Sequence, residues 1–127
     1  MIERNPQIPI KSKLLERVYE NIPPLAVYII TDTTLPSNAY IPQSCHAALL
    51  FYKYNGPLKD LWAERDRTIV VLGTSDMDST IKKLKEDGHY PTIWTEDDYG
   101  NKITSIVIGP VIKAEAEEYF KDYKLLK

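Results

Sequence analysis

Residues 43–49 read Gln43-Ser44-Cys45-His46-Ala47-Ala48-Leu49, and they say more about the fold than any other part of the chain. They follow an almost wholly apolar run, Leu25 to Thr31, and a polar loop from Asp32 to Asn38. The apolar run predicts a buried central strand, and the segment from Tyr40 to Tyr54 predicts a helix. The order strand, loop, helix indicates the beginning of an α/β domain.

The rest of the chain alternates between strand and helix patterns. Further strands are predicted at 68–72, 91–95 and 103–108, and further helices at 11–22, 58–64, 75–88 and 113–123. Leu125-Leu126 predicts a few more extended residues. The strands at 91–95 and 103–108 are joined by a short turn and should be antiparallel, whereas strands separated by helices can be parallel. The sequence therefore predicts an α/β fold: a three-layer α/β/α sandwich with a mixed four-stranded sheet.

Two helices carry local signals that place their residues. In the helix from Tyr40, the apolar side chains recur at helical spacing and should face the core, at Ile41, Cys45, Ala48, Leu49 and Tyr52. Cys45 is then expected to be a buried structural thiol, because it falls on that stripe. In the helix after the second strand, Ser75 is the expected N-cap and Asp78 occupies the acidic N3 position.

The overall numbers favour one globular domain with an appendage. The chain has 127 residues, of which 43% are hydrophobic and 27% charged. Residues 1–24 are broken by four prolines and predict an N-terminal extension with a short helix, Lys11 to Ile22. Residues 25–127 predict the domain itself. No apolar run is long enough to span a membrane, and the chain start lacks the pattern of a secretory signal.

Charge and cysteine content exclude several classes of function. A net charge of −2 argues against extensive contact with nucleic-acid phosphates, and the Lys82, Lys83 and Lys85 cluster reads as a solvated helix face. The single cysteine, Cys45, excludes an internal disulfide and suits a reducing compartment, so we expect a cytoplasmic protein. Cys45 with His46 and His89 cannot form an ordinary zinc site. We expect no metal and no cofactor.

Chemistry in such folds gathers beyond the carboxyl ends of strands, which here means the 31–38 loop and the following helix start. His46 lies one turn into that helix and could act as a general base, or simply bond a neighbouring carbonyl or carboxylate. Asp32 could orient a base, or hold a loop amide as an Asx turn. Gln43 could bind substrate or face solvent.

A second candidate region is the acidic turn Glu96-Asp97-Asp98. Two carboxylates can perform acid–base work if their pKa values are driven apart. The alternative is a solvated hairpin turn. Trp94 and Tyr99 beside it could stack a nucleobase, although core packing explains Trp94 equally well.

Together these segments resemble the type II peptidyl-tRNA hydrolase family. The matching pieces are the strand ending in Thr31-Asp32, the helix carrying 43–49, the strand at 68–72, the Ser75 helix, and the strand at 103–108 with Gly109-Pro110. The closing residues 123–126 match as well, so the resemblance covers roughly 25–127. It implies one α/β/α domain that cleaves the ester joining a peptide to tRNA without a cofactor.

The resemblance also implies site residues. Asp32, Gln43 and His46 carry over, and Asp97 stands near the family aspartate. The lysine-rich family loop is here Ser37-Asn38-Ala39, without a lysine, and the family's Asp-Ala-Gly-Arg-Thr loop is replaced by residues 95–101. The pattern resembles a divergent branch that lacks both loops. The expected catalytic residues are His46, Asp32 and Asp97, and the expected substrate-binding residues are Gln43, Asn38 and Ser37.

Three functions follow as hypotheses. The first is hydrolysis of peptidyl-tRNA, with His46 as base or orienter and the tRNA acceptor end as partner, at a rate reduced by the missing lysine. The second is a non-catalytic module that binds an RNA end or a protein partner. The third is an interaction domain that uses residues 1–24 as an arm. A homodimer is compatible with each of them, and no membrane partner is expected.

Overall fold

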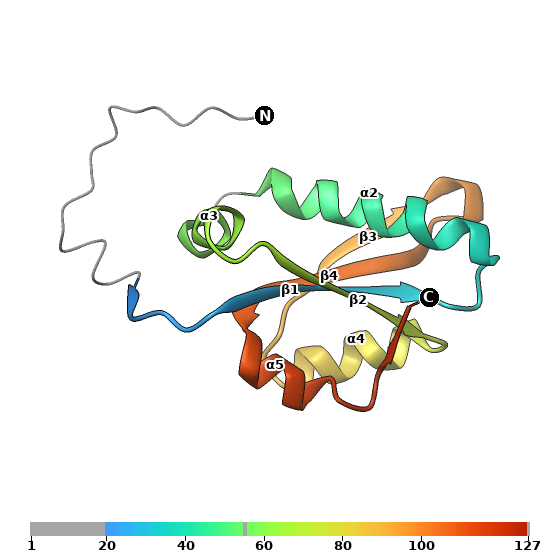
Figure 1. The fold of residues 1–127 in the computed structure, drawn as a ribbon. Helices are drawn as coiled ribbons and strands as arrows, with labels where there is room; N and C mark the ends of the chain where they lie inside the picture. The colour runs from blue at the N-terminus through green and yellow to red at the C-terminus, as the bar shows by residue number, and fades with distance from the viewer. Residues whose placement is uncertain (1–19, 55, 127) are drawn as a thin grey trace.

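The computed structural model describes residues 20–54 and 56–126. Their strands form a five-stranded sheet in the order β3-β4-β1-β2-β5, with helices on both faces (Figure 1). The strands are β1 (Leu25–Asp32), β2 (Thr68–Thr74), β3 (Thr92–Glu96), β4 (Lys102–Ile112) and β5 (Lys124–Leu125). The sheet is mixed because β1 and β2 are parallel, whereas β1–β4, β3–β4 and β2–β5 are antiparallel.

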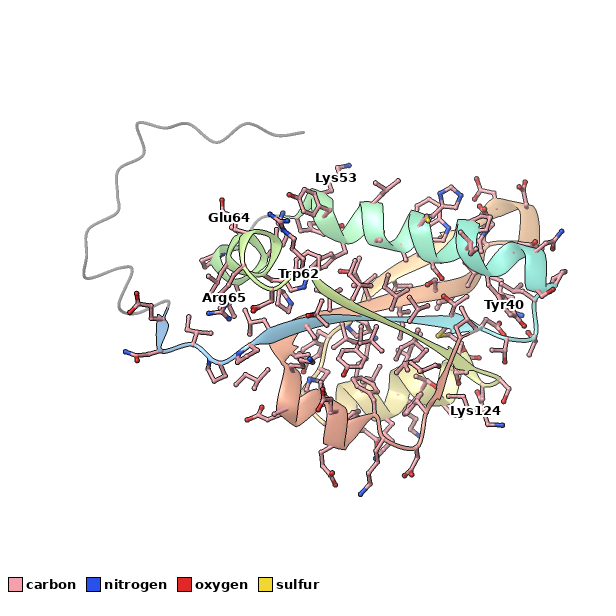
Figure 2. All side chains as sticks on the ribbon, viewed as in Figure 1. Tyr40, Lys53, Trp62, Glu64, Arg65 and Lys124 are labelled. Atoms are coloured by element: carbon pink, nitrogen blue, oxygen red, sulfur yellow. The ribbon has the colours of Figure 1, made fainter. Side chains whose placement is uncertain are left out.

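The helices lie in two layers, as the three-layer prediction required. They are η1 (Ser37–Ala39), α2 (Tyr40–Lys53), α3 (Pro57–Glu64), α4 (Met77–Glu86), η2 (Asp97–Tyr99) and α5 (Lys113–Tyr119). In Figure 1, α2 and α3 cover one face of the sheet and α4 and α5 cover the other. Side chains fill both spaces (Figure 2). The predicted fold class is confirmed.

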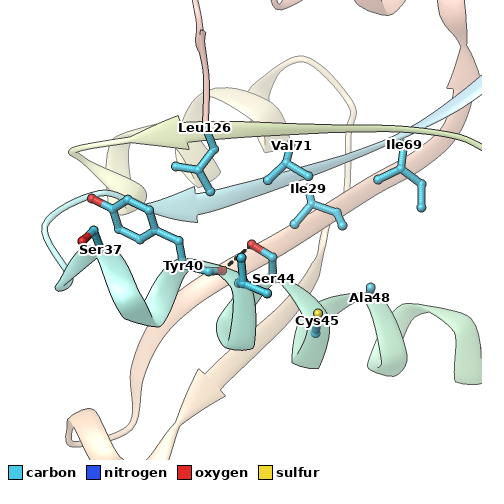
Figure 3. A pocket seen from close by; sticks show the side chains of 10 residues that line it. Ile29, Ser37, Tyr40, Ser44, Cys45, Ala48, Ile69, Val71 and Leu126 are labelled. Carbon is cyan, nitrogen blue, oxygen red and sulfur yellow. Dashed lines mark hydrogen bonds between the residues drawn. The ribbon is translucent and has the colours of Figure 1, made fainter.

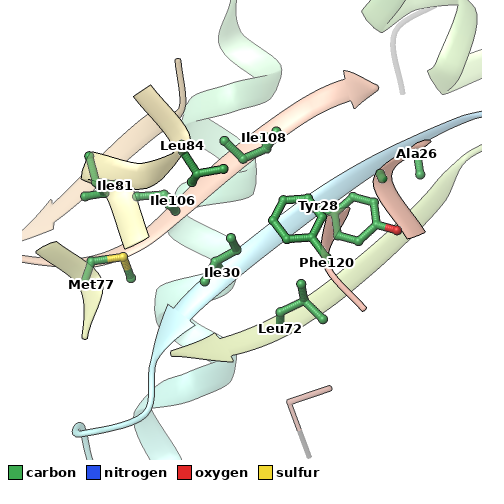
Figure 4. Packing of buried hydrophobic residues seen from close by; sticks show 11 residues of the cluster. Ala26, Tyr28, Ile30, Leu72, Met77, Ile81, Leu84, Ile106, Ile108 and Phe120 are labelled. Atoms are coloured by element: carbon green, nitrogen blue, oxygen red, sulfur yellow. The ribbon is translucent and has the colours of Figure 1, made fainter. Parts of the chain in front are cut away.

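The central strand β1 is buried along its whole length, which explains its unbroken apolar sequence. Its side chains alternate between two cores. Leu25, Val27 and Ile29 pack towards α2 and α3 with Phe51 and Trp62. Figure 4 shows the core on the α4 and α5 side, where Ala26, Tyr28 and Ile30 pack with Leu84 and Phe120.

Two strand predictions need correction. The sheet has five strands rather than four, because the extended residues at the end of the chain form β5 and pair with β2 through Leu72 and Leu125. The strand β4 continues beyond Ile108 to Ile112. At Gly109 the backbone φ is +128°, and the Cβ of any other residue at this position would lie 2.9 Å from the carbonyl oxygen of Ala26. Glycine therefore lets β4 continue alongside β1, although it reads as a stop in sequence.

Three helix predictions were also wrong. The buried face of α2 carries Gln43, Ser44, Ala47 and Phe51. Of the expected stripe only Ala48 packs against the core, and the other four side chains are exposed. Ile41 is 76% exposed and Leu49 is 71% exposed. The N-cap of α4 is Asp76 rather than Ser75, since its Oδ1 accepts from the amide of Ser79 at 3.1 Å. The last helix, α5, ends at Tyr119 rather than Tyr123.

Most of the predicted extension lies outside the described residues, including the helix from Lys11. At its end, Glu20 is helical and Asn21-Ile22 form a turn. Ile22 packs against the core on the α2 and α3 side. In the described part of the chain, no helix has the length and apolar character needed to cross a membrane.

Candidate functional site

Asp32 ends β1 and is buried, with every described contact made inside the protein. Its Oδ1 accepts from the amide and the hydroxyl of Thr34, at 2.8 Å and 2.7 Å. Its Oδ2 pairs with Nζ of Lys102 at 2.8 Å, and Nζ also donates to the Thr34 hydroxyl. Burial would raise the pKa of Asp32, but the hydrogen bonds from Lys102 and Thr34 and the lysine charge outweigh it, so the pKa lies below its ordinary value.

Gln43 anchors the first turns of α2 to the sheet. Its Oε1 accepts from the hydroxyl of Thr104 at 2.6 Å, and its Nε2 donates to Oε1 of Glu96 at 3.0 Å. The other oxygen of Glu96 accepts from the amide of Asp97 at 3.1 Å. An irregularity in the β3–β4 pairing, between Trp94 and Thr95, leaves Thr104 outside the regular register and lets it reach α2. Both ends of the Gln43 amide are thus engaged.

Three hydroxyls beneath α2 form a second buried network. Thr31 Oγ1 lies 2.7 Å from Ser44 Oγ and 2.9 Å from Ser105 Oγ. Ser44 donates to the carbonyl of Tyr40 at 2.7 Å. Because each hydroxyl has one proton and Ser44 gives its own to Tyr40, Thr31 donates to Ser44. The Ser105 hydroxyl then has two acceptors within reach, Thr31 Oγ1 at 2.9 Å and the carbonyl of Ile30 at 3.3 Å. This hydrogen-bond network explains how α2 can bury the Ser44 hydroxyl. The network contains no base that would activate Ser44 as a nucleophile.

His46 lies half-buried above β3. Its ring stacks on Trp94, with 5.0 Å between the ring centroids and 23° between the planes. Gln43 and His46 are three residues apart and lie on one side of α2. Their partners Glu96 and Trp94 are two residues apart in β3 and lie on one side of that strand. Among the described residues, none hydrogen-bonds to the ring nitrogens of His46, and the buried Nε1 of Trp94 also lacks a partner.

The structure does not bring all of the expected residues together. Asp32 continues the alternation of Tyr28 and Ile30 towards α4, and it lines a cavity with Asp76 and Lys102. His46 lies on the other side of the sheet, towards α2. No hydrogen bond joins the two residues in the part of the chain that the structure describes.

The remaining expected residues lie on exposed turns. Ser37 and Asn38 are on η1, directly before α2. Asp97 begins η2 and is exposed, and Glu96 connects this turn to Gln43. The structure therefore places Asp97 on the turn that adjoins the Gln43 side of α2, and Asp32 on the opposite face.

In a comparison with known protein families, residues 25–126 match the model of the family peptidyl-tRNA hydrolase PTH2. The match runs from the first residue of β1 to the end of the described chain. The chain belongs to the PTH2 family. A search of curated proteins found no match.

Sequence reasoning on this PTH2 chain missed Lys102. This lysine begins β4, far from Asp32 in sequence, and the loop before α2 in this chain has no lysine of its own. The signal that could have found it is the sheet order, because β4 runs antiparallel to β1 and its beginning lies beside the end of β1. The roles of Glu96 and Thr104 depend on the same non-local pairing.

The most apolar cavity of this PTH2 protein is a groove between α2 and β2, with a volume of about 450 Å³ (Figure 3). Its walls include Ile29, Ile69 and Val71 from the sheet, and Cys45 and Ala48 from α2. The prediction of a buried Cys45 was wrong, since this thiol is exposed beside the groove. In the described chain, His46 lines neither this groove nor four other surface cavities.

Proposed function

We propose that this PTH2 family protein hydrolyses the ester bond between peptide and tRNA, slowly, with His46 as the general base. The observation that carries the proposal is the placement of His46 in the second turn of α2, with its ring stacked on Trp94 and its nitrogens without a partner among the described residues. An imidazole held in one orientation, with a free nitrogen, is suited to accept a proton from water.

The reaction uses water as the nucleophile. His46 takes one proton from the water while its oxygen bonds to the ester carbonyl carbon. The bond from that carbon to the ribose oxygen then breaks, and the ribose oxygen takes the proton from His46. The products are free tRNA and a peptide carboxylic acid, which loses its remaining proton to solvent and becomes a carboxylate.

The other proposed roles follow from position. Asp97, on the turn tied to Gln43 through Glu96, faces solvent and is assigned to orient the water or the imidazole. Ser37 and Asn38, exposed before α2, are assigned to contact the acceptor end of tRNA. Asp32 is assigned the role of holding the loop after β1 in place, and Gln43 the role of attaching α2 to the sheet. The polar atoms of both side chains are hydrogen-bonded within the protein.

The reaction should be slow because the loop before α2 carries no lysine. Removing one preorganised donor from an enzyme site costs about 10²–10³ in rate. With a net charge of −2, binding should use few phosphate contacts and depend only modestly on salt. We place the reaction in translation and in the cytoplasm, where a free thiol such as Cys45 stays reduced.

The direct test is release of free tRNA from an N-blocked aminoacyl-tRNA by the full chain. The His46→Ala variant should lose about 10²-fold or more of the rate, as expected for loss of a general base. Leu49→Ala is the matched control, because it truncates an exposed side chain on the same helix. Release no faster than in buffer, at micromolar protein, would contradict the proposal.

A second candidate is a binding module without catalysis. The full internal bonding of Asp32 and Gln43 favours it, since two residues that carry over from the family are not available to substrate. Retention of the uncleaved aminoacyl-tRNA on a filter at low salt, without release of free tRNA, would support this function. If tRNA is neither retained nor cleaved, a protein partner or a second copy becomes the partner to test.

A further inference from the structure

The groove between α2 and β2 is an uncovered part of the core. On this face of the sheet α2 lies over β1, β3 and β4, while Ile69 and Val71 of β2 border open space. Ile69 is 52% exposed, and Ile41 across the groove is 76% exposed. Contiguous apolar side chains of this kind mark a surface on which another segment packs.

We propose that residues 1–19 of the same chain cover this groove. The chain enters the described fold in the correct layer for this. Ile22 packs against the core cluster that includes Leu25 and Trp62, on the α2 and α3 side of the sheet. Arg65, at the end of α3 (Figure 2), donates to the carbonyls of Ile22 and Pro23 at 2.9 Å and 2.8 Å. The described chain therefore enters the fold on the same face as the groove.

The distance to the groove is short compared with the length of the segment. Ile69 pairs with Val27, which is five residues after Ile22. Five extended residues span at most about 17 Å. Nineteen residues span about 28 Å as a helix and roughly 63 Å when extended.

The segment also has the right chemistry. Its sequence places Ile10, Leu14, Leu15 and Val18 at helical spacing, and these side chains match the apolar groove walls. A tether holds the segment near the groove at an effective concentration of about millimolar. A second copy, which is present at a far lower concentration, competes poorly with it.

The first test uses Cys45, the single cysteine, as a reporter because it lines the groove. The full-length double variant Leu14→Ser with Val18→Ser removes apolar side chains from the segment. The reaction of Cys45 with Ellman's reagent should become about tenfold faster, because the thiol is no longer shielded by the apolar side chains of the segment. The control, Lys13→Ser with Glu16→Ser, changes the opposite side of the predicted helix and should leave the rate unchanged.

Equal rates in the wild type and the Leu14→Ser, Val18→Ser variant would overturn the proposal. So would a wild-type rate that falls as protein concentration rises together with a dimer in sedimentation, because a second copy would then be the cover. If Cys45 of the monomer reacts fast and neither double variant changes its rate, the groove is open to an external partner. That result would also overturn the proposal.

A second measurement does not depend on destabilising variants. A nitroxide is attached to a Ser12→Cys chain in a Cys45→Ser background, and paramagnetic broadening of backbone amides is recorded by NMR. The amides of Ile69 and Val71 should broaden, whereas those of Lys82 and Lys85 on the opposite layer should not. Absence of broadening at Ile69 and Val71 would overturn the proposal.

Discussion

At the scale of single residues, the polar side chains at the end of β1 and in the first turns of α2 are of two kinds. Some are hydrogen-bonded within the protein, and others are free to contact a substrate. Asp32 is engaged with Thr34 and Lys102, and Gln43 with Thr104 and Glu96. His46 is oriented by stacking alone. This division gives each residue a different expected response to substitution.

Replacing Asp32 by asparagine should weaken the fold in a pH-dependent way. At neutral pH the loss of the Lys102 ion pair should lower the free energy of unfolding by about 2 kcal/mol. The folded pKa of Asp32 lies below its ordinary value of about 3.9, so this stabilisation is present above that pH and is lost as the pH falls through the folded value. Urea denaturation should show that the difference in unfolding free energy between wild type and Asp32→Asn disappears below about pH 4. A difference that stays constant into acid would contradict this assignment.

Replacing Gln43 by alanine tests its structural role. The change leaves the Thr104 hydroxyl and a Glu96 oxygen without their partner and should cost about 2 kcal/mol of unfolding free energy. His46→Ala should cost only about 1 kcal/mol, since it removes one ring stack at a half-buried position. Urea denaturation measures both. A Gln43→Ala protein as stable as the wild type, yet unable to bind tRNA, would instead assign Gln43 to substrate.

At the scale of elements, the cap of α4 separates sequence expectation from structure. Asp76→Ala should lower the thermal stability measurably, because the Asp76 side chain accepts from the amide and hydroxyl of Ser79. Ser75→Ala is the control and should have little effect. Thermal unfolding of the two variants checks the assignment, and the reverse order of stability would show that Ser75 is the cap.

The orientation of α2 is tested by a pair of truncations. Phe51 is buried against Trp62, so Phe51→Ala should cost about 3–4 kcal/mol. Leu49 is exposed, and Leu49→Ala should change stability by less than about 0.5 kcal/mol. Similar losses for both variants in chemical denaturation would mean that Leu49 is covered in solution.

Elements with strong local patterns were predictable from the sequence. The apolar run from Leu25 predicted β1, and the helical patterns at 58–64 and 75–88 predicted α3 and α4; each of these elements was found within a few residues. The facing of α2 was not predictable, because its buried side carries Gln43 and Ser44. These residues tolerate burial only through hydroxyl and carboxylate partners on β1, β3 and β4.

At the scale of the whole molecule, the fold class follows from the order of strands and helices, but the site depends on sheet geometry. Strand alternation separates Asp32 from His46, and the antiparallel β1–β4 pairing brings Lys102 to Asp32. Neither effect has a local signature. The candidate residues were therefore visible in the sequence, but the way in which they combine was not.

We assign the proposed reaction to the α2 and β3 side of the sheet, and single-turnover kinetics can check this assignment. The measurement is the single-turnover rate of tRNA release, compared between wild type, His46→Ala and Asp32→Asn at a temperature where all three are folded. We expect slow release by the wild type, a loss of about 10²-fold or more in His46→Ala, and a rate within about threefold of wild type in Asp32→Asn. Equal losses in both variants, or no release by the wild type, would contradict it.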